Sequence, residues 1–78
     1  MPLAFVLINT ELGATEDVLN RLHRIPNVKD AYMVYGVYDI IARIEAESMA
    51  QLQSTISEQI RVIDNIRSTL TTIVMEED

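Results

Sequence analysis

Two runs of strand-forming residues meet at a single glycine, Gly36, near the middle of this chain. The runs lie within residues 28–35 and 37–44. Both contain valine and tyrosine, and the second also contains isoleucine, all residues that favour the pleated strand. A glycine followed by one further residue suits the two-residue type II′ turn, so this segment predicts a β-hairpin. The hairpin sets Asp39 beside the turn in an otherwise apolar run. A carboxylate needs a partner there, either within the protein or on a ligand.

A strand and a helix are predicted before the hairpin. The short apolar run over residues 3–8 predicts a buried strand. In the helix that follows, Thr15 is placed to cap the N-terminus and Pro26 ends the helical segment. The stripe that faces the core is expected to consist of Val18, Leu22 and Ile25.

Another helix and a last strand are predicted after the hairpin. Ser48 and Gln51 have the spacing of a capping box at a helix N-terminus. The helix is expected to end at Asp64-Asn65, and the last strand to run over residues 66–75. The apolar stripe of this helix recurs at three- and four-residue steps, at Met49, Leu52, Ile56, Ile60 and Ile63.

The order β-α-β-β-α-β is the split βαβ arrangement of ferredoxin-like α+β folds. Right-handed crossovers place both helices on one face of a four-stranded antiparallel sheet and leave the other face open. The first strand is nevertheless apolar on both sides, with Leu3, Phe5 and Leu7 opposite Ala4, Val6 and Ile8. Because an exposed apolar sheet face marks an interface, we predict a homodimer that packs sheet against sheet, like a dimeric α/β barrel.

The composition bounds the kinds of site that the chain can hold. The 78 residues make one domain over residues 1–78, and the absence of cysteine excludes disulfides and thiolate chemistry. A single histidine cannot build a zinc site of N and S ligands, and we expect no metal and no cofactor. The net charge of −6 and the scattered arginines argue against direct nucleic-acid binding. No run is long enough to span a bilayer or resembles a secretion signal, so we expect a cytoplasmic protein with no membrane partner.

Three segments resemble one known family. Residues 35–40, Tyr-Gly-Val-Tyr-Asp-Ile, are similar to the Gly-x-Tyr-Asp hairpin of the regulation of amino acid metabolism (RAM) domain. This domain is the effector-binding half of the Lrp/AsnC transcription regulators. Residues 68–77 resemble its Thr-x-Thr final strand, and residues 26–31 resemble its helix-to-strand junction. The resemblance covers residues 3–77, although relatives often have Pro-Gly-Val where this chain has Asp-Asn-Ile at residues 64–66.

The resemblance implies a non-enzymatic module that binds an amino-acid effector and assembles. Relatives usually carry an N-terminal helix-turn-helix domain, so this chain resembles a stand-alone RAM domain without a DNA-binding domain. In the family, dimers assemble further, often into octameric rings, and an amino acid can bind between dimers. The implied role is regulation of transcription in amino-acid metabolism, through association with helix-turn-helix-containing regulators.

The resemblance also implies ligand-binding residues in the hairpin. Gly36 would present its backbone to the ligand at close range, and Tyr35 and Tyr38 would wall the pocket. Tyr35 stands where many relatives have a smaller threonine. The alternative is that the tyrosines pack at interfaces with their hydroxyls bonded.

The charged ends of the effector are assigned by the same resemblance. Asp39 would accept hydrogen bonds from the ammonium, and Thr69 and Thr71, on one face of the last strand, would hold the carboxylate. The alternatives are structural. Asp39 bonds turn amides or an arginine across an interface, and the two threonines are ordinary strand formers.

Two other classes of function remain open. Dimeric ferredoxin-like proteins also include cofactor-free monooxygenases and isomerases, which need a polar catalytic pair. The sole candidate base here, His23, has no acidic partner at helical spacing and is better explained as a surface histidine. A purely structural oligomerisation module with no ligand is the other alternative. Turnover would establish the enzyme, and a ligand screen separates the effector module from the structural one.

Overall fold

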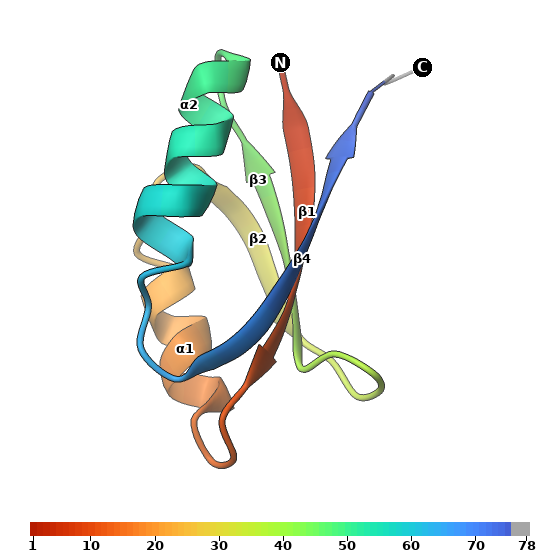
Figure 1. Cartoon of the computed structure of the whole chain (residues 1–78), viewed down its shortest axis with the longest axis vertical. Coiled ribbons are helices and arrows are strands. Elements are labelled where there is room, and N and C mark those ends of the chain that lie inside the picture. Colours follow the sequence, from red (N-terminus) through yellow and green to blue (C-terminus); the bar gives the residue numbers. More distant parts are fainter. Residues whose placement is uncertain (76–78) are drawn as a thin grey trace.

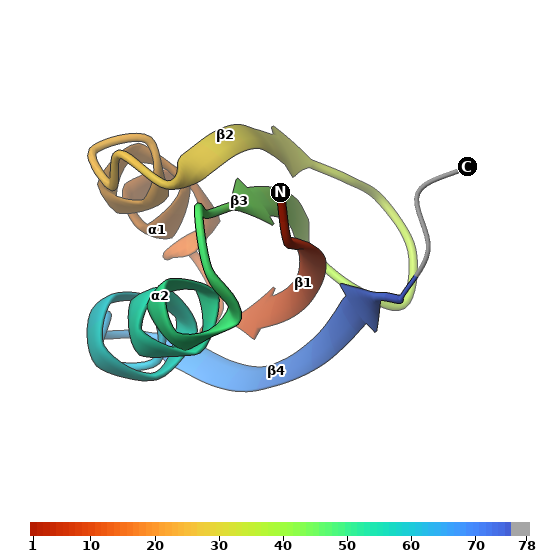
Figure 2. The same cartoon turned by 90° about the horizontal axis from the view of Figure 1, so that it is seen from above.

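The computed structural model describes residues 1–75 and shows one antiparallel sheet with both helices on the same face (Figure 1). The strands are β1 (Leu3–Thr10), β2 (Val28–Met33), β3 (Ile40–Glu45) and β4 (Ile66–Val74), in the order β2-β3-β1-β4. Helix α1 (Thr15–Leu22) follows β1, and helix α2 (Met49–Ser54) continues into the π-helical segment η1 (Thr55–Ile60). Seen from above, α1 lies beside β2 and β3, and α2 lies over β1 and β4 (Figure 2). The predicted ferredoxin-like α+β fold is therefore confirmed.

The core lies between the helices and one face of the sheet. Ala4, Val6 and Ile8 of β1 are fully buried, and the register sets them opposite Ile44, Ala42 and Ile40 of β3. The helices add fully buried Val18, Leu22, Leu52 and Ile60, with Ile56 nearly so. The two predicted helical stripes are thus largely confirmed. The prediction that Met49 belongs to the core is wrong, because this residue is 41% exposed.

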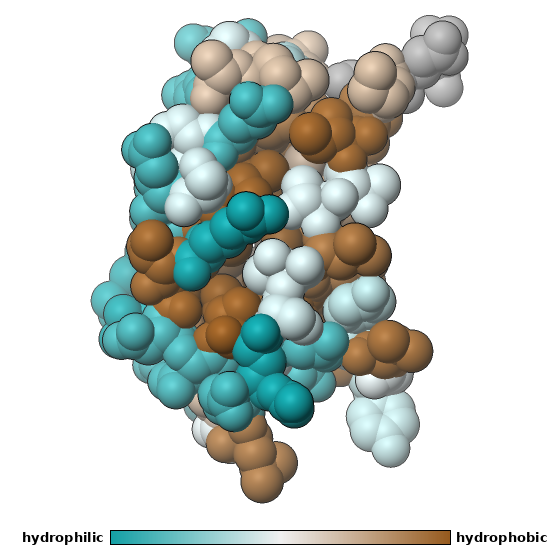
Figure 3. All heavy atoms as spheres, viewed as in Figure 1, coloured by the Kyte–Doolittle hydropathy of each residue, from teal (hydrophilic) through white to brown (hydrophobic). Residues whose placement is uncertain are grey.

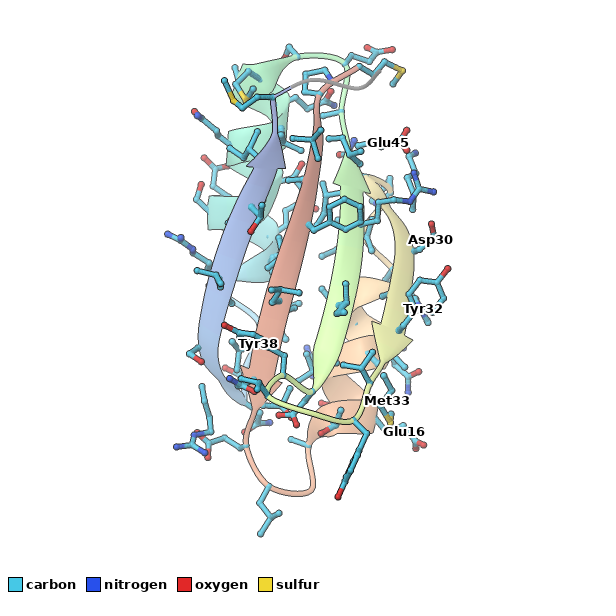
Figure 4. The ribbon with its side chains drawn as sticks, turned by 90° about the vertical axis from the view of Figure 1, so that its right-hand side faces the viewer. Glu16, Asp30, Tyr32, Met33, Tyr38 and Glu45 are labelled. Atoms are coloured by element: carbon cyan, nitrogen blue, oxygen red, sulfur yellow. The ribbon has the colours of Figure 1, made fainter. Side chains whose placement is uncertain are left out.

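The opposite face of the sheet, which we call the open face, carries a second apolar set (Figure 4). The register places Leu7 between Ile41 and Leu70, and Leu3 beside Val74. Phe5 is 36% exposed and Leu70 is 50% exposed on this face, which no other part of residues 1–75 covers. The prediction that β1 is apolar on both sides is confirmed.

The hairpin differs from its prediction. Strand β2 ends at Met33 and β3 begins at Ile40, so residues 34–39 form a loop rather than a two-residue turn. Gly36 does not take the positive φ that a type II′ turn requires at its first central residue. The reason lies in the hydrogen bonds of Asp39, whose N–H donates to the Ile8 carbonyl (2.9 Å) and so ties the loop to β1.

The helix ends show one prediction confirmed and one wrong. The Ser48 hydroxyl accepts from the Gln51 N–H (3.1 Å), as the capping box predicts. Thr15 does not cap α1. The N-cap residue is Ala14, and the Thr15 hydroxyl bonds instead to the Thr10 hydroxyl (2.7 Å), which ties the helix start to β1. The second helix also ends earlier than predicted, at Ile60, and its second half is the π-helical segment η1.

The connection before β4 passes through Asn65 in a left-handed conformation. Asn65 adopts φ 73°, the left-handed region that glycine enters freely and that asparagine tolerates better than most residues. Its carbonyl accepts from the Glu11 N–H (2.8 Å), which joins the β1–α1 loop to the start of β4. The last strand ends at Val74, and Glu76 and Glu77 of the motif lie outside the described residues.

Candidate functional site

Asp39 lies where the hairpin loop meets the end of β1. Its Oδ2 accepts from the Thr10 N–H (2.9 Å) and from the Thr10 hydroxyl (3.3 Å). Thr10 is 6% exposed and its hydroxyl also bonds to that of Thr15, so the carboxylate joins β1, α1 and the hairpin. Within residues 1–75, no hydrogen bond reaches Asp39 Oδ1. The structure therefore gives Asp39 a structural partner and leaves one of its oxygens available.

A cavity of about 260 Å³ opens beside this carboxylate. We call it the Asp39 cavity. Gly13 adopts φ 82° in the loop that forms one wall, a conformation that a residue with a Cβ enters only with strain. The cavity contains side chains of both charges, and it is lined by Thr10, Glu11, Leu12, Gly13, Thr15, Asp39 and Arg67.

Arg67 is a site residue that the sequence did not reveal. The register pairs Asn9 with Ser68 but Thr10 with Ile66, so Arg67 is the extra residue of a β-bulge in β4. Bulges commonly redirect a side chain at a sheet edge or beside a functional site. Here the bulge brings a guanidinium to the cavity that contains Asp39. Bulge positions depend on pairing with a distant strand, and no local sequence signal marks this one.

The other hairpin residues lie outside the Asp39 cavity. Tyr35 is fully exposed and Val37 is 83% exposed at the tip of the loop. Gly36 has open space where a Cβ would stand, so nothing within this chain approaches its backbone. Tyr38 is half-buried and lies over the open face near the end of β1 (Figure 4). The structure brings none of these three predicted residues, Tyr35, Gly36 or Tyr38, into the cavity.

Thr69 and Thr71 point to the helix-covered side of the sheet. The register sets Thr69 beside Ile8 and Thr71 beside Val6, and both neighbours are fully buried core residues. Thr71 lines a different cavity, between η1 and β4, and neither threonine lines the Asp39 cavity. The two charged ends of the implied site, Asp39 and the threonine pair, are therefore separated within one chain.

An ion cluster lies on the open face at the β2–β3 edge (Figure 4). Arg43 contacts Asp30 (2.5 Å) and also Glu45, with about one third of each side chain exposed. The hydrogen bond from Arg43 to Asp30 raises the pKa of the guanidinium, and the attraction of Glu45 adds to this. Within residues 1–75, this cluster contains the only ion pairs on the open face.

Several other kinds of site find no support in residues 1–75. His23 is exposed and its Nε2 lies 3.2 Å from the Ala31 carbonyl, so it bridges α1 and β2. No three histidine, aspartate or glutamate side chains gather as metal ligands in this part of the chain. None of its helices has the length and apolar character needed to cross a membrane.

One protein-family model matches nearly the whole chain. The sequence model of the Lrp/AsnC ligand binding domain matches residues 3–77. An HTH-type transcriptional regulator of Pyrococcus abyssi is 32% identical over 71 residues, which is 91% of this chain and 45% of that protein. The crystal structure of a hypothetical protein from Pyrococcus horikoshii superposes with a TM-score of 0.92 at 39% identity, covering 99% of this chain and 93% of the other.

A second kind of relative is an enzyme. Homocitrate synthase of Sulfurisphaera tokodaii is 38% identical over 63 residues, which is 81% of this chain but 14% of the enzyme. The chain thus spans less than half the length of both curated relatives, the regulator and the synthase. The match to the Lrp/AsnC ligand binding domain covers residues 3–77, which include all four strands and both helices. The chain belongs to the Lrp/AsnC ligand binding domain family.

Proposed function

We propose that this chain is a non-enzymatic effector-binding and oligomerisation module that recognises an amino acid and acts in the regulation of amino-acid metabolism. One observation carries the proposal: Asp39 and Arg67 line the same cavity. A free amino acid carries an ammonium and a carboxylate close together, and a paired acid and guanidinium offer the matching charges. The family membership of the chain supports the same role.

The effector is held by its two charged ends. Asp39 accepts from the ammonium through Oδ1, while Oδ2 keeps its bonds to Thr10. Arg67 takes the carboxylate, because its guanidinium presents paired donors to two oxygens. The volume of about 260 Å³ favours a small effector.

The remaining implied residues act between copies of the chain. Tyr35 and Gly36 stand at the exposed hairpin tip, where they can meet a ligand or a surface of another copy. Thr69 and Thr71 face the helices of their own chain and line no part of the Asp39 cavity, so contact with the effector would require a rearrangement at β4 on assembly. Tyr38 lies over the open face outside the Asp39 cavity, where it can meet a second copy of the chain.

The assembly begins with a homodimer through the open face. Leu7, Ile41 and Leu70 form a continuous apolar group there, and a monomer would leave it in water. Contact between two identical faces closes a two-fold dimer. The exposed hairpin tips remain free to join dimers into a larger ring such as an octamer, or to recruit helix-turn-helix-containing regulators of the family.

Thermal unfolding against each proteinogenic amino acid tests the effector. A ligand present at a hundred times its dissociation constant adds about 2.7 kcal/mol to the free energy of unfolding, which raises the melting temperature by several degrees. We expect one amino acid, or one chemical group of them, to give this shift. A flat panel contradicts effector binding and favours the purely structural module.

Three variants locate the site. Asp39→Asn keeps an oxygen for the Thr10 N–H but removes the charge, and Arg67→Gln removes the guanidinium. We expect both to abolish the ligand-dependent shift while the oligomer survives. Asp64→Asn, in the exposed loop before β4, is the matched control and keeps the shift. A shift that persists in Asp39→Asn places the effector elsewhere.

A second candidate role follows from the homocitrate synthase match. That enzyme contains a segment similar to this chain, so the domain also occurs in a protein that is not a regulator of transcription. In this case the module adjusts a biosynthetic enzyme directly. Co-expression with a homocitrate synthase and with a helix-turn-helix regulator, followed by native mass spectrometry, distinguishes the two roles by which mixed oligomer forms.

A further inference from the structure

Glu11 is a third charged residue of the Asp39 cavity, and the effector contacts proposed above make no use of it. It follows β1 directly and lies in the loop that leads to α1. This loop is at the bottom of Figure 1, and Figure 3 shows strongly hydrophilic side chains at the same end of the molecule. The charged residues that line the cavity are therefore two acids, Glu11 and Asp39, and one arginine, Arg67.

The backbone of Glu11 is held on both sides. Its N–H donates to the Asn65 carbonyl (2.8 Å), which ties the residue to the segment just before Arg67. Its carbonyl accepts from the Ala14 N–H (3.0 Å) and closes a turn in which Gly13 has φ 82°. Glu11 therefore has a fixed position beside the cavity, and its exposed side chain is free to turn toward a ligand.

The charge of Glu11 has no partner within residues 1–75. The ion pairs of this part of the chain lie on α1 and at the β2–β3 edge, and none of them includes Glu11 or Arg67. The lining of the cavity thus carries one more negative charge than positive charge. Because like charges repel at short range, a ligand that supplies a further cation is favoured there.

The charges of the lining decide which class of amino acid complements the cavity. Every amino acid brings an ammonium for Asp39 and a carboxylate for Arg67, and one with a neutral side chain leaves Glu11 uncompensated. A second carboxylate on the ligand adds repulsion. A second ammonium supplies the missing positive charge, and a short chain suits a volume of about 260 Å³.

We propose that the effector is a basic amino acid with a short, unbranched side chain, and that Glu11 selects it by binding the side-chain ammonium. The inference rests on the proposed function, because it keeps the effector's other two charges at Asp39 and Arg67. A contact between an ammonium and a carboxylate is a charge-assisted hydrogen bond, roughly twice as strong as a neutral one. Substitution of Glu11 therefore changes which amino acid binds, whereas substitution of Asp39 removes binding altogether.

Isothermal titration calorimetry with three five-carbon amino acids tests this selection. Ornithine, norvaline and glutamate have unbranched chains that end in an ammonium, a methyl group and a carboxylate. We expect ornithine to bind about tenfold more tightly than norvaline, because only ornithine makes the charge-assisted contact. Glutamate should bind more weakly than norvaline. Added salt should reduce the ratio between ornithine and norvaline, since the contact is partly exposed.

Variants assign the selection to Glu11. Glu11→Gln keeps the length of the side chain and removes its charge, so it should weaken ornithine about tenfold and leave norvaline unchanged. Glu11→Asp keeps the charge and should retain the preference for ornithine. Glu58→Gln, an exposed glutamate of η1 outside the cavity lining, is the matched control and should leave all three affinities unchanged.

The possible outcomes separate this inference from the proposed function. Equal binding of ornithine and norvaline, or tighter binding of glutamate, contradicts a basic effector while the amino-acid site stands. A preference for ornithine that survives in Glu11→Gln removes Glu11 as its cause. If no proteinogenic amino acid and none of the three probes binds, the proposed function fails and the inference fails with it. Asp39→Asn should abolish the binding of ornithine and norvaline alike, which Glu11→Gln should not.

Discussion

The two faces of the sheet carry similar apolar residues but differ in what covers them. On β1, Ala4, Val6 and Ile8 face the helices and are fully buried, whereas Leu3, Phe5 and Leu7 face outward and stay partly exposed. The covered face contributes to the stability of the single chain. The open face offers comparable residues to a partner and adds an ion cluster that a core would not need. Alternate residues of β1 thus contribute to the folded core and to the face that is available for association.

The largest effect should come from shortening a side chain on the covered face. Ile8→Ala removes a fully buried side chain that contacts both neighbouring strands, and it should lower the free energy of unfolding by about 2–5 kcal/mol. Urea unfolding followed by circular dichroism measures this. Leu12→Ala, fully exposed in the β1–α1 loop, is the control and should change stability by less than about 0.5 kcal/mol. Equal effects of the two variants would contradict the separation of the faces.

A charge on the open face should break the dimer and leave the fold intact. Leu70 is half-exposed in the single chain and lies beside Leu7, so Leu70→Asp costs the monomer little but places a carboxylate in the proposed interface. We expect the dimer dissociation constant to rise about 100-fold, measured by sedimentation equilibrium. Val62→Asp, exposed after η1, should not change it. If the parent protein is monomeric at micromolar concentration, the predicted dimer does not form.

A smaller change in stability, this time an increase, is expected from removing the unpartnered Thr71 hydroxyl on the covered face. Thr71→Val replaces the unpartnered Oγ1 by a methyl group of similar size, and it should raise the free energy of unfolding by about 1 kcal/mol without ligand. Thr72→Val, the next residue on the exposed side of the same strand, is the control and should be nearly neutral. A loss of stability in Thr71→Val would show that the hydroxyl has a bonding partner in solution.

The sequence predicts those parts of the molecule that depend on local periodicity. The alternation of β1 and the stripe at Val18 and Leu22 follow from spacing alone, and the structure has both. The hairpin loop and the role of Thr15 do not, because each is determined by a bond to β1, from Asp39 and from the Thr15 hydroxyl. Those bonds exist only once distant segments have met.

The candidate site was harder to predict for the same reason. Asp39 stands out in the sequence as a carboxylate in an apolar run. Arg67 does not, because its direction comes from a bulge in the pairing of β4 with β1. The resemblance grouped Asp39 with Thr71, whereas the alternation of β4 sends Thr71 to the helix side of the sheet. A linear motif does not record which face each of its residues will take.

The smallest effect concerns the ion cluster, and it separates the two faces most finely. A double-mutant cycle on Arg43→Met and Asp30→Asn measures the coupling of this pair by urea unfolding. In a Leu70→Asp background, where the chain is monomeric, the pair stays partly in water and its coupling should be small, as for surface ion pairs. In the parent dimer the open face loses water, so the same coupling should increase and each single substitution should become costlier. Equal coupling in the two backgrounds would mean that the cluster lies outside the interface, and the dimer would then be centred on Leu7 and Leu70 at the other side of the open face.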